Sequence, residues 1–181
     1  MTLRYLPAHR ESALLALELA CKEASHLRYS HRTLFAQPVD VDWVHQLAEN
    51  QEMAEKVEAF VSRFGRLQDH IGEKLIPRFA ALFGEAPKSM LDSMVWAEKM
   101  QWVQSAEDFF SARKLRNLLV HEYMSDSVLF LESLLAAREA AEMLFGVITS
   151  LEFEARSINL AEPPPVKTHP EHGIVSNSHS H

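Results

Sequence analysis

The sequence predicts an all-α protein, an up-and-down helical bundle that pairs as a two-fold dimer. Apolar residues recur three or four positions apart along most of the chain, which is the spacing of one helix face. Five glycines in 181 residues are too few for the many tight turns of a sandwich or a barrel. With 47% hydrophobic residues, the chain can bury a sizeable core but is short for two ordinary domains. We therefore expect one domain over residues 1–160, followed by a disordered tail over residues 161–181.

The first helix is expected from about Arg10 to Tyr29, where leucines and alanines are abundant enough to be buried on more than one side. Pro38 disfavours helix in the residue before it and so predicts a connection. Asp40 or Asp42 then offers a side-chain oxygen that would cap a long second helix.

The second helix carries the strongest periodic pattern of the chain. Its apolar stripe comprises Met53, Val57, Phe60, Val61, Phe64, Leu67, Ile71, Leu75, Phe79 and Leu82. Gly65, Gly72 and Pro77 interrupt the stripe, so we expect a kink or break near Pro77 and termination at Gly84.

Three further helical segments complete the predicted bundle. A short one covers residues 90–100, and Ser105 with Asp108 forms a capping-box pattern at the start of the next. Asp126 or Ser125 can cap the last helix. Its apolar positions are Val128, Leu131, Leu135, Leu144, Ile148 and Leu151. The short connections between four or five helices favour antiparallel neighbours.

Charge and composition limit the classes of function. The formal charge of −7 and the pI near 5.8 exclude a protein that is basic over its whole surface, so a phosphate site would have to be local. The lone Cys21 cannot form an internal disulfide, and the N-terminal segment lacks the apolar run of a signal peptide. We expect a cytoplasmic protein that does not associate with membranes.

A polar octet, RNLLVHEY at residues 116–123, interrupts a leucine-rich helical segment. On a helix Asn117 and His121 share a face, whereas Arg116 and His121 lie about 140° apart. The long stem of Arg116 can carry its guanidinium toward the imidazole, so all three heads can meet at one groove. Three leucines of the segment are expected to face the core: Leu115, Leu118 and Leu119.

Each polar residue of the octet also has a purely structural interpretation. Arg116 would pair with Glu122 or with an acid on a neighbouring helix, and His121 would be a buried, hydrogen-bonded histidine. Residue by residue, this interpretation is favoured, because arginine and histidine are common in helices.

Taken together, the residues resemble the RX4HXY motif of HEPN proteins, specifically of the HepT-like toxin branch. Arg116 is followed by four residues, then His121, Glu122 and Tyr123, and Asn117 directly after the arginine matches the common form of that branch. The helix order and the segment RLQDHIGEKLIP extend the similarity, more loosely, over about residues 10–155. This resemblance implies a HEPN-like bundle that dimerises.

The resemblance also implies a function. The chain would be a metal-independent RNA endonuclease, the toxin of a type VII-like toxin–antitoxin pair. Its partner would be a minimal nucleotidyltransferase antitoxin of the MntA type, which silences the toxin by adding AMP to the motif tyrosine, here Tyr123. No cofactor is implied.

The chemistry suits these side chains, because RNA supplies its own nucleophile in the 2′-hydroxyl. We expect His121 to be a general base or acid and Arg116 to clamp the phosphate. Asn117 would orient His121 or bond the phosphate, and Tyr123 would fix the substrate or the imidazole. One imidazole cannot conveniently accept and donate a proton in one concerted step, so a dimer with His121 near its axis would supply the second.

Several interpretations stay open at this stage. The apolar faces of the second helix and the octet helix are expected to exceed what one bundle covers, which favours the dimer. The chain could also be a non-catalytic HEPN-like partner that binds nucleotide or substrate for a nucleotidyltransferase, or a structural dimer with a decayed site. Basic residues at 113–116 and 63–78 form either solvated faces or phosphate-facing rims. The ten histidines show no paired ligand spacing.

Overall fold

The computed structural model describes residues 4–121 and 125–162, and the regular structure of this part is entirely helical. The predicted all-α bundle is therefore confirmed. The elements are a 3₁₀ turn (Pro7–His9), α1 (Arg10–Leu34), α2 (Val41–Gln46), α3 (Gln51–His70), a π-helical segment (Ile71–Leu75), α4 (Ile76–Leu82), α5 (Met90–Lys99), α6 (Ala106–His121) and α7 (Ser127–Ser157).

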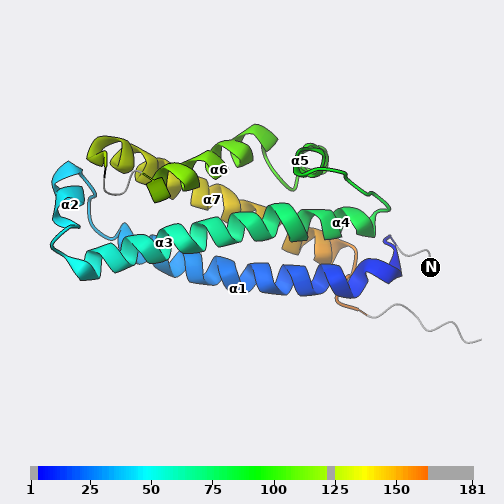
Figure 1. The fold of residues 1–181 in the computed structure, drawn as a ribbon. Helices are drawn as coiled ribbons and strands as arrows, with labels where there is room; N and C mark the ends of the chain where they lie inside the picture. Colours follow the sequence, from blue (N-terminus) through cyan, green and yellow to red (C-terminus); the bar gives the residue numbers. More distant parts are fainter. Residues whose placement is uncertain (1–3, 122–124, 163–181) are drawn as a thin grey trace, which may run out of the picture.

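The long segments are α1, α3 with its continuation through α4, α6 and α7, and they run up and down beside one another (Figure 1). The helix α1 packs against α3 and α7, and α6 packs against the same two helices, so the four close a ring around one core. The short helices α2 and α5 lie at opposite ends of the bundle (Figure 1). This arrangement places α6, which carries the octet residues from Arg116 to His121, beside α3.

The first two predicted helices need correction. The helix α1 continues beyond Tyr29 to Leu34, because Ser30 and Leu34 are still buried against the bundle. Asp40 accepts a hydrogen bond from the Trp43 amide, as predicted, but the helix it caps ends at Gln46.

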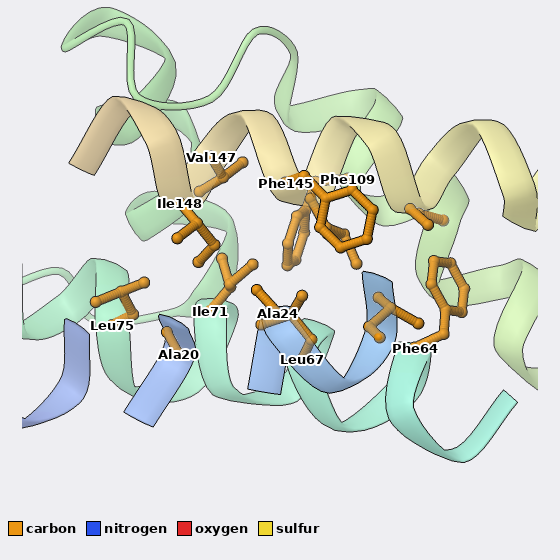
Figure 2. Close-up of a cluster of buried hydrophobic side chains, with 14 of the residues drawn as sticks. Ala20, Ala24, Phe64, Leu67, Ile71, Leu75, Phe109, Phe145, Val147 and Ile148 are labelled. Carbon is orange, nitrogen blue, oxygen red and sulfur yellow. The ribbon is translucent and has the colours of Figure 1, made fainter. Parts of the chain in front are cut away.

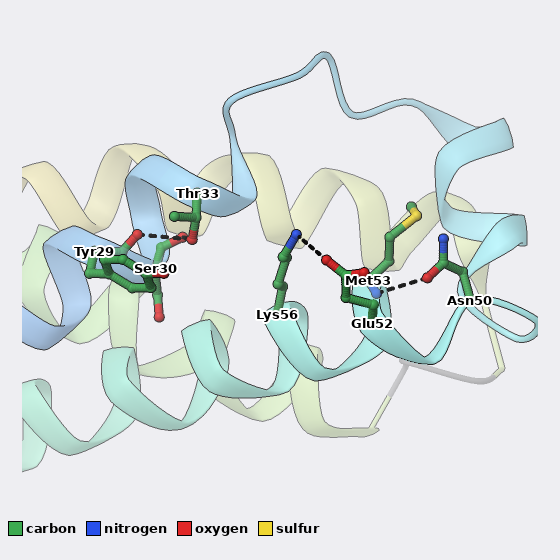
Figure 3. Close-up of polar contacts among 7 residues, drawn as sticks. All are labelled: Tyr29, Ser30, Thr33, Asn50, Glu52, Met53 and Lys56. Atoms are coloured by element: carbon green, nitrogen blue, oxygen red, sulfur yellow. Dashed lines mark hydrogen bonds and ion pairs between the residues drawn. The ribbon is translucent and has the colours of Figure 1, made fainter.

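A separate cap starts α3 and divides the predicted second helix. The Asn50 side chain accepts a hydrogen bond from the Met53 amide at 3.1 Å (Figure 3). On the next turn Lys56 pairs with Glu52 at 3.0 Å across four residues (Figure 3). These contacts begin a new helix where sequence reasoning expected an uninterrupted one.

The interruption predicted near Pro77 is present as a π-helical segment just before it. The amide of Ile76 bonds the carbonyl of Ile71, five residues back. Because proline lacks an amide hydrogen and its ring clashes with the carbonyl four residues earlier, a wider turn accommodates it without ending the helix. The helix therefore continues through α4, and Gly84 ends it with a φ of +81°.

The later helices begin at the predicted caps. Ser105 Oγ accepts from the Asp108 amide at 3.1 Å. Asp126 Oδ1 accepts from the amides of Val128 and Leu129 at 3.1 and 2.9 Å. Short-range capping chemistry thus sets where α6 and α7 start.

The core lies between the four long helices, as Figure 2 shows for buried side chains of α1, α3, α6 and α7. Phe64, Leu67, Ile71 and Leu75 of the predicted stripe are completely buried within the single chain. The expectation that this stripe exceeds what one bundle can cover is therefore wrong. Large exposed apolar side chains lie elsewhere: Leu6, Leu15, Leu19, Tyr29, Leu91, Val95, Val120, Val128 and Phe153.

At the chain ends, Leu160 is buried, and Arg10 donates to the carbonyls of Leu160 and Ala161 at 2.8 and 2.7 Å. Most of the tail predicted for residues 161–181 lies outside the described residues. Within residues 4–121 and 125–162, no helix combines the length and apolarity needed to cross a membrane.

The cap of α7 provides a test of the fold. Asp126→Ala leaves two amides without their acceptor, so we expect the free energy of unfolding to fall by about 1 kcal/mol in urea titration. Asp126→Asn keeps a capping oxygen and is the matched control, expected to stay within a few tenths of a kcal/mol of wild type. Equal losses in the two variants would show that the cap is not the stabilising feature.

Candidate functional site

Arg116 of α6 is directed toward α3, where it meets Asp69. Its Nη1 donates to Asp69 Oδ2 at 2.7 Å, and Arg113 Nη1 donates to Asp69 Oδ1 at 3.1 Å. The two arginines are three residues apart and project from the same side of α6. Each therefore takes one oxygen of a single carboxylate on the neighbouring helix.

A glycine on α3 makes room for Arg116. A Cβ added at Gly65 would lie 2.6 Å from Nε and 2.9 Å from Cδ of Arg116, closer than real Cβ contacts. Gly65 precedes Asp69 by four residues, so both lie on one face of α3. The stem of Arg116 thus crosses α3 at Gly65 and its guanidinium reaches Asp69 one turn later.

The charges of this cluster do not cancel. Two guanidinium groups share one carboxylate, which leaves one positive charge at the crossing of α3 and α6. The side chains of Arg116, Arg113 and Asp69 are 40%, 31% and 32% exposed. Exposed ion pairs contribute only about 0–1 kcal/mol to stability, and a partly exposed guanidinium remains accessible to an anion.

Asn117 and His121 lie on the exposed side of α6. Lys114, Asn117 and His121 are spaced three and four apart, so they form one solvent-facing stripe. In the described part of the chain, neither Asn117 nor His121 has a side-chain hydrogen bond or ion pair. The alternative that His121 is a buried, bonded histidine is therefore wrong.

The octet residues are not all brought together. Arg116 turns to Asp69, which realises the alternative of an acid on a neighbouring helix. Among the described side chains it has no hydrogen bond to Asn117 or His121. Leu119 is buried, as expected, whereas Leu115 and Leu118 are only half-buried. Glu122 and Tyr123 lie outside the described residues, so the role expected of Tyr123 stays a prediction.

The sequence patterns did not indicate Asp69 or Gln68 as site residues, and they indicated Gly65 only as an interruption of the apolar stripe. Gln68 is completely buried, and neither its Oε1 nor its Nε2 has a hydrogen-bond partner among the described residues. A glycine inside a strong helical pattern, four residues before an acid, is the signal that could have indicated a close approach by a basic side chain.

Other reactive groups are less suited to chemistry. The pKa of the Cys21 thiol is raised to about 11, mainly by burial and to a lesser extent by the neighbouring Glu152 carboxylate. The thiol is therefore protonated at neutral pH and is a poor nucleophile. Over the described ranges, no three His, Cys, Asp or Glu side chains gather as metal ligands would.

Compared with protein-family models, curated proteins and solved structures, the chain matches none. The resemblance to HepT-like proteins thus rests on the motif residues and the helix order.

Two glycines allow a test of the Arg116 position. Gly65→Ala must displace Arg116, whereas a Cβ at Gly146 on α7 meets nothing within 4 Å. Both changes gain helix propensity, about 0.5–1 kcal/mol. We expect Gly146→Ala to gain that amount in urea titration and Gly65→Ala to gain less, since it loses the Asp69 contact. The Nε–H resonance of Arg116 should shift only in Gly65→Ala; equal stabilisation with unchanged resonances would contradict this role for Gly65.

Proposed function

We propose that this chain is a metal-independent RNA endonuclease, the toxin of a type VII-like toxin–antitoxin pair. The observation that carries the proposal is the uncompensated positive charge of Arg113 and Arg116, which share the Asp69 carboxylate and lie on the same helix as the exposed His121. His121 follows Arg116 by five residues, a rise of about 7.5 Å along the helix. In this proposal one phosphodiester spans both groups, although the guanidinium and the imidazole leave α6 in different directions.

The reaction needs no group beyond these side chains and the RNA. A base removes the proton of the 2′-hydroxyl, and the 2′-oxygen attacks the adjacent phosphorus. The bond from phosphorus to the 5′-oxygen breaks, and that oxygen receives a proton, leaving a 2′,3′-cyclic phosphate and a free 5′-hydroxyl. Arg116 stabilises the charge that develops on the phosphoryl oxygens, while His121 transfers protons.

A two-fold dimer completes this mechanism. Because Asn117 and His121 are exposed on a single chain, a second copy would enclose them and bring a second imidazole for the opposite proton transfer. Val120, on the same helix and 59% exposed, offers apolar surface for such a contact. Asn117 would then orient His121 or bond the phosphate.

The pairing of Arg116 with Asp69 favours a second candidate function. An arginine held by a carboxylate suits steady binding, so the chain could be a non-catalytic HEPN-like partner that presents nucleotide or substrate to a nucleotidyltransferase. The two functions differ in one measurable property, since only the first breaks the RNA backbone.

The catalytic roles are tested by substitution. Arg116→Ala and His121→Ala should each lower the cleavage rate of an RNA oligonucleotide about 100-fold or more. Circular dichroism and light scattering should show wild-type helix content and a dimer for both, because the two side chains do not fill the core. Cleavage by the wild type should persist in excess chelator.

Two residues provide matched controls for this experiment. Arg138 is a similarly exposed arginine paired with one acid, Glu139, and His45 is an exposed histidine of α2. Arg138→Ala and His45→Ala should cut RNA at the wild-type rate. Cleavage that stops with chelator, or survives in either octet variant, would reject the mechanism.

The control of the toxin is tested at Tyr123. A phosphate attached two positions after His121 would offer Arg116 a tethered anion in place of RNA and would repel the substrate backbone. Co-expression with the cognate nucleotidyltransferase should therefore add one or more adenylyl groups to the Tyr123 peptide and remove toxicity, as measured by mass spectrometry and growth. Tyr123→Phe should escape modification. Unmodified Tyr123 in neutralised, co-purified protein would instead favour steric inhibition.

A further inference from the structure

A small groove between α1 and α3 lies outside the octet. It encloses about 250 Å³ and is lined by Glu23, His26, Arg63 and Arg66. This volume is below the range of pockets that enclose drug-sized ligands, and it suits a unit as small as one sugar phosphate. The chemistry of its lining indicates what that unit carries.

The two arginines make the groove positive. Arg63 is fixed in place, since its Nη1 donates to Ser30 Oγ at 2.6 Å and to the His26 carbonyl at 3.2 Å. Arg66 is exposed. Among the residues that the structure describes, no acid forms an ion pair with either guanidinium. With Glu23 counted, the groove keeps one net positive charge and two guanidinium groups able to bind a phosphate.

Glu23 adds an acceptor that lacks a donor. Its Oε2 is buried and its Oε1 is open to the groove, and neither has a hydrogen-bond partner in the described part of the chain, so Oε1 is the oxygen that a ligand hydroxyl can reach. Nδ1 of the buried His70 lies 3.8 Å from the buried Oε2. The other ring nitrogen of His70 contacts the Ala16 carbonyl at 2.8 Å, and because a carbonyl only accepts, that nitrogen carries the hydrogen. In neutral His70, Nδ1 therefore has no hydrogen to offer Glu23.

We infer that this groove is a second subsite that binds one ribose phosphate, with the phosphate at Arg63 and Arg66 and the ribose 2′-hydroxyl donating to Glu23. A carboxylate that accepts from a ribose hydroxyl is a common element of nucleotide sites. The inference rests on the proposed function only in taking an RNA strand as the source of the ribose phosphate.

The subsite lies next to the charged cluster of the octet. Arg66 precedes Asp69 by three residues, a rise of about 4.5 Å along α3. An RNA strand that crosses the outer face of α3 would therefore meet the groove first and then Arg113 and Arg116 at Asp69. Because DNA lacks the 2′-hydroxyl, Glu23 would also let the protein distinguish RNA from DNA.

The test measures binding separately from cleavage. The full chain carrying His121→Ala is titrated with a labelled RNA oligonucleotide, with DNA of the same sequence and with AMP. Arg66→Gln should weaken RNA and DNA binding alike, and it should reduce the slope of log affinity against log salt concentration by about one. Glu23→Ala should bring the ratio of RNA to DNA affinity toward one, and the more conservative Glu23→Gln should do so partially. Arg138→Gln, on α7, is the control and should change none of these.

Each outcome bears on the assignment. If Arg66→Gln weakens the binding of AMP but not of RNA, the ribose-phosphate site is supported and its ligand is a free nucleotide. The assignment would be overturned if Arg66→Gln changed the affinity for none of the three probes. It would also be overturned if the ratio of RNA to DNA affinity were unchanged in both Glu23 variants. If the wild type does not cut RNA while Arg66-dependent RNA binding remains, the nuclease proposal fails and the subsite stands.

Discussion

The approach of α6 to α3, and of α5 to the π-helical segment that follows α3, depends on two glycines, Gly65 of α3 and Gly72 of that segment. Gly65 and Gly72 are seven residues apart and so share one face of the helix. A Cβ at Gly65 would meet Arg116, and one at Gly72 would lie 3.0 Å from the end of Met90 and 3.3 Å from the ring of Phe109. Without side chains at these positions, Phe109 reaches the core and Arg116 reaches Asp69. One packing constraint thus fixes the hydrophobic interior and the placement of the charged cluster.

Much of the fold could be predicted because it follows from local chemistry. Periodic apolar residues predicted the long helices, and the caps at Asp40, Ser105 and Asp126 form as short-range hydrogen bonds. The errors arose where several signals compete. The chain leaves helix after Gln46 and starts a new one at the Asn50 cap, while the extension of α1 depends on burial against helices distant in sequence.

The candidate site was only partly predictable, for a different physical reason. Helix geometry gives the direction in which each octet residue leaves α6, and it placed Asn117 and His121 on one face. The direction of a long arginine side chain depends on which acid lies on the neighbouring helix. The spacing of residues within one segment does not reveal which acid that is. Asp69 and Glu23 became visible only when tertiary packing placed them beside guanidinium groups.

The π-helical segment has a consequence for how the chain can vary. Such a turn accommodates one extra residue in an otherwise regular helix, so the residues before and after it keep their faces. Loss of one residue within Ile71–Leu75 would restore a regular helix with Phe79 and Leu82 still directed to the core. The ring of Pro77 would then meet the carbonyl one turn earlier. The extra residue and the proline are therefore expected to be retained or lost together, which gives distant relatives a shared mark apart from sequence identity.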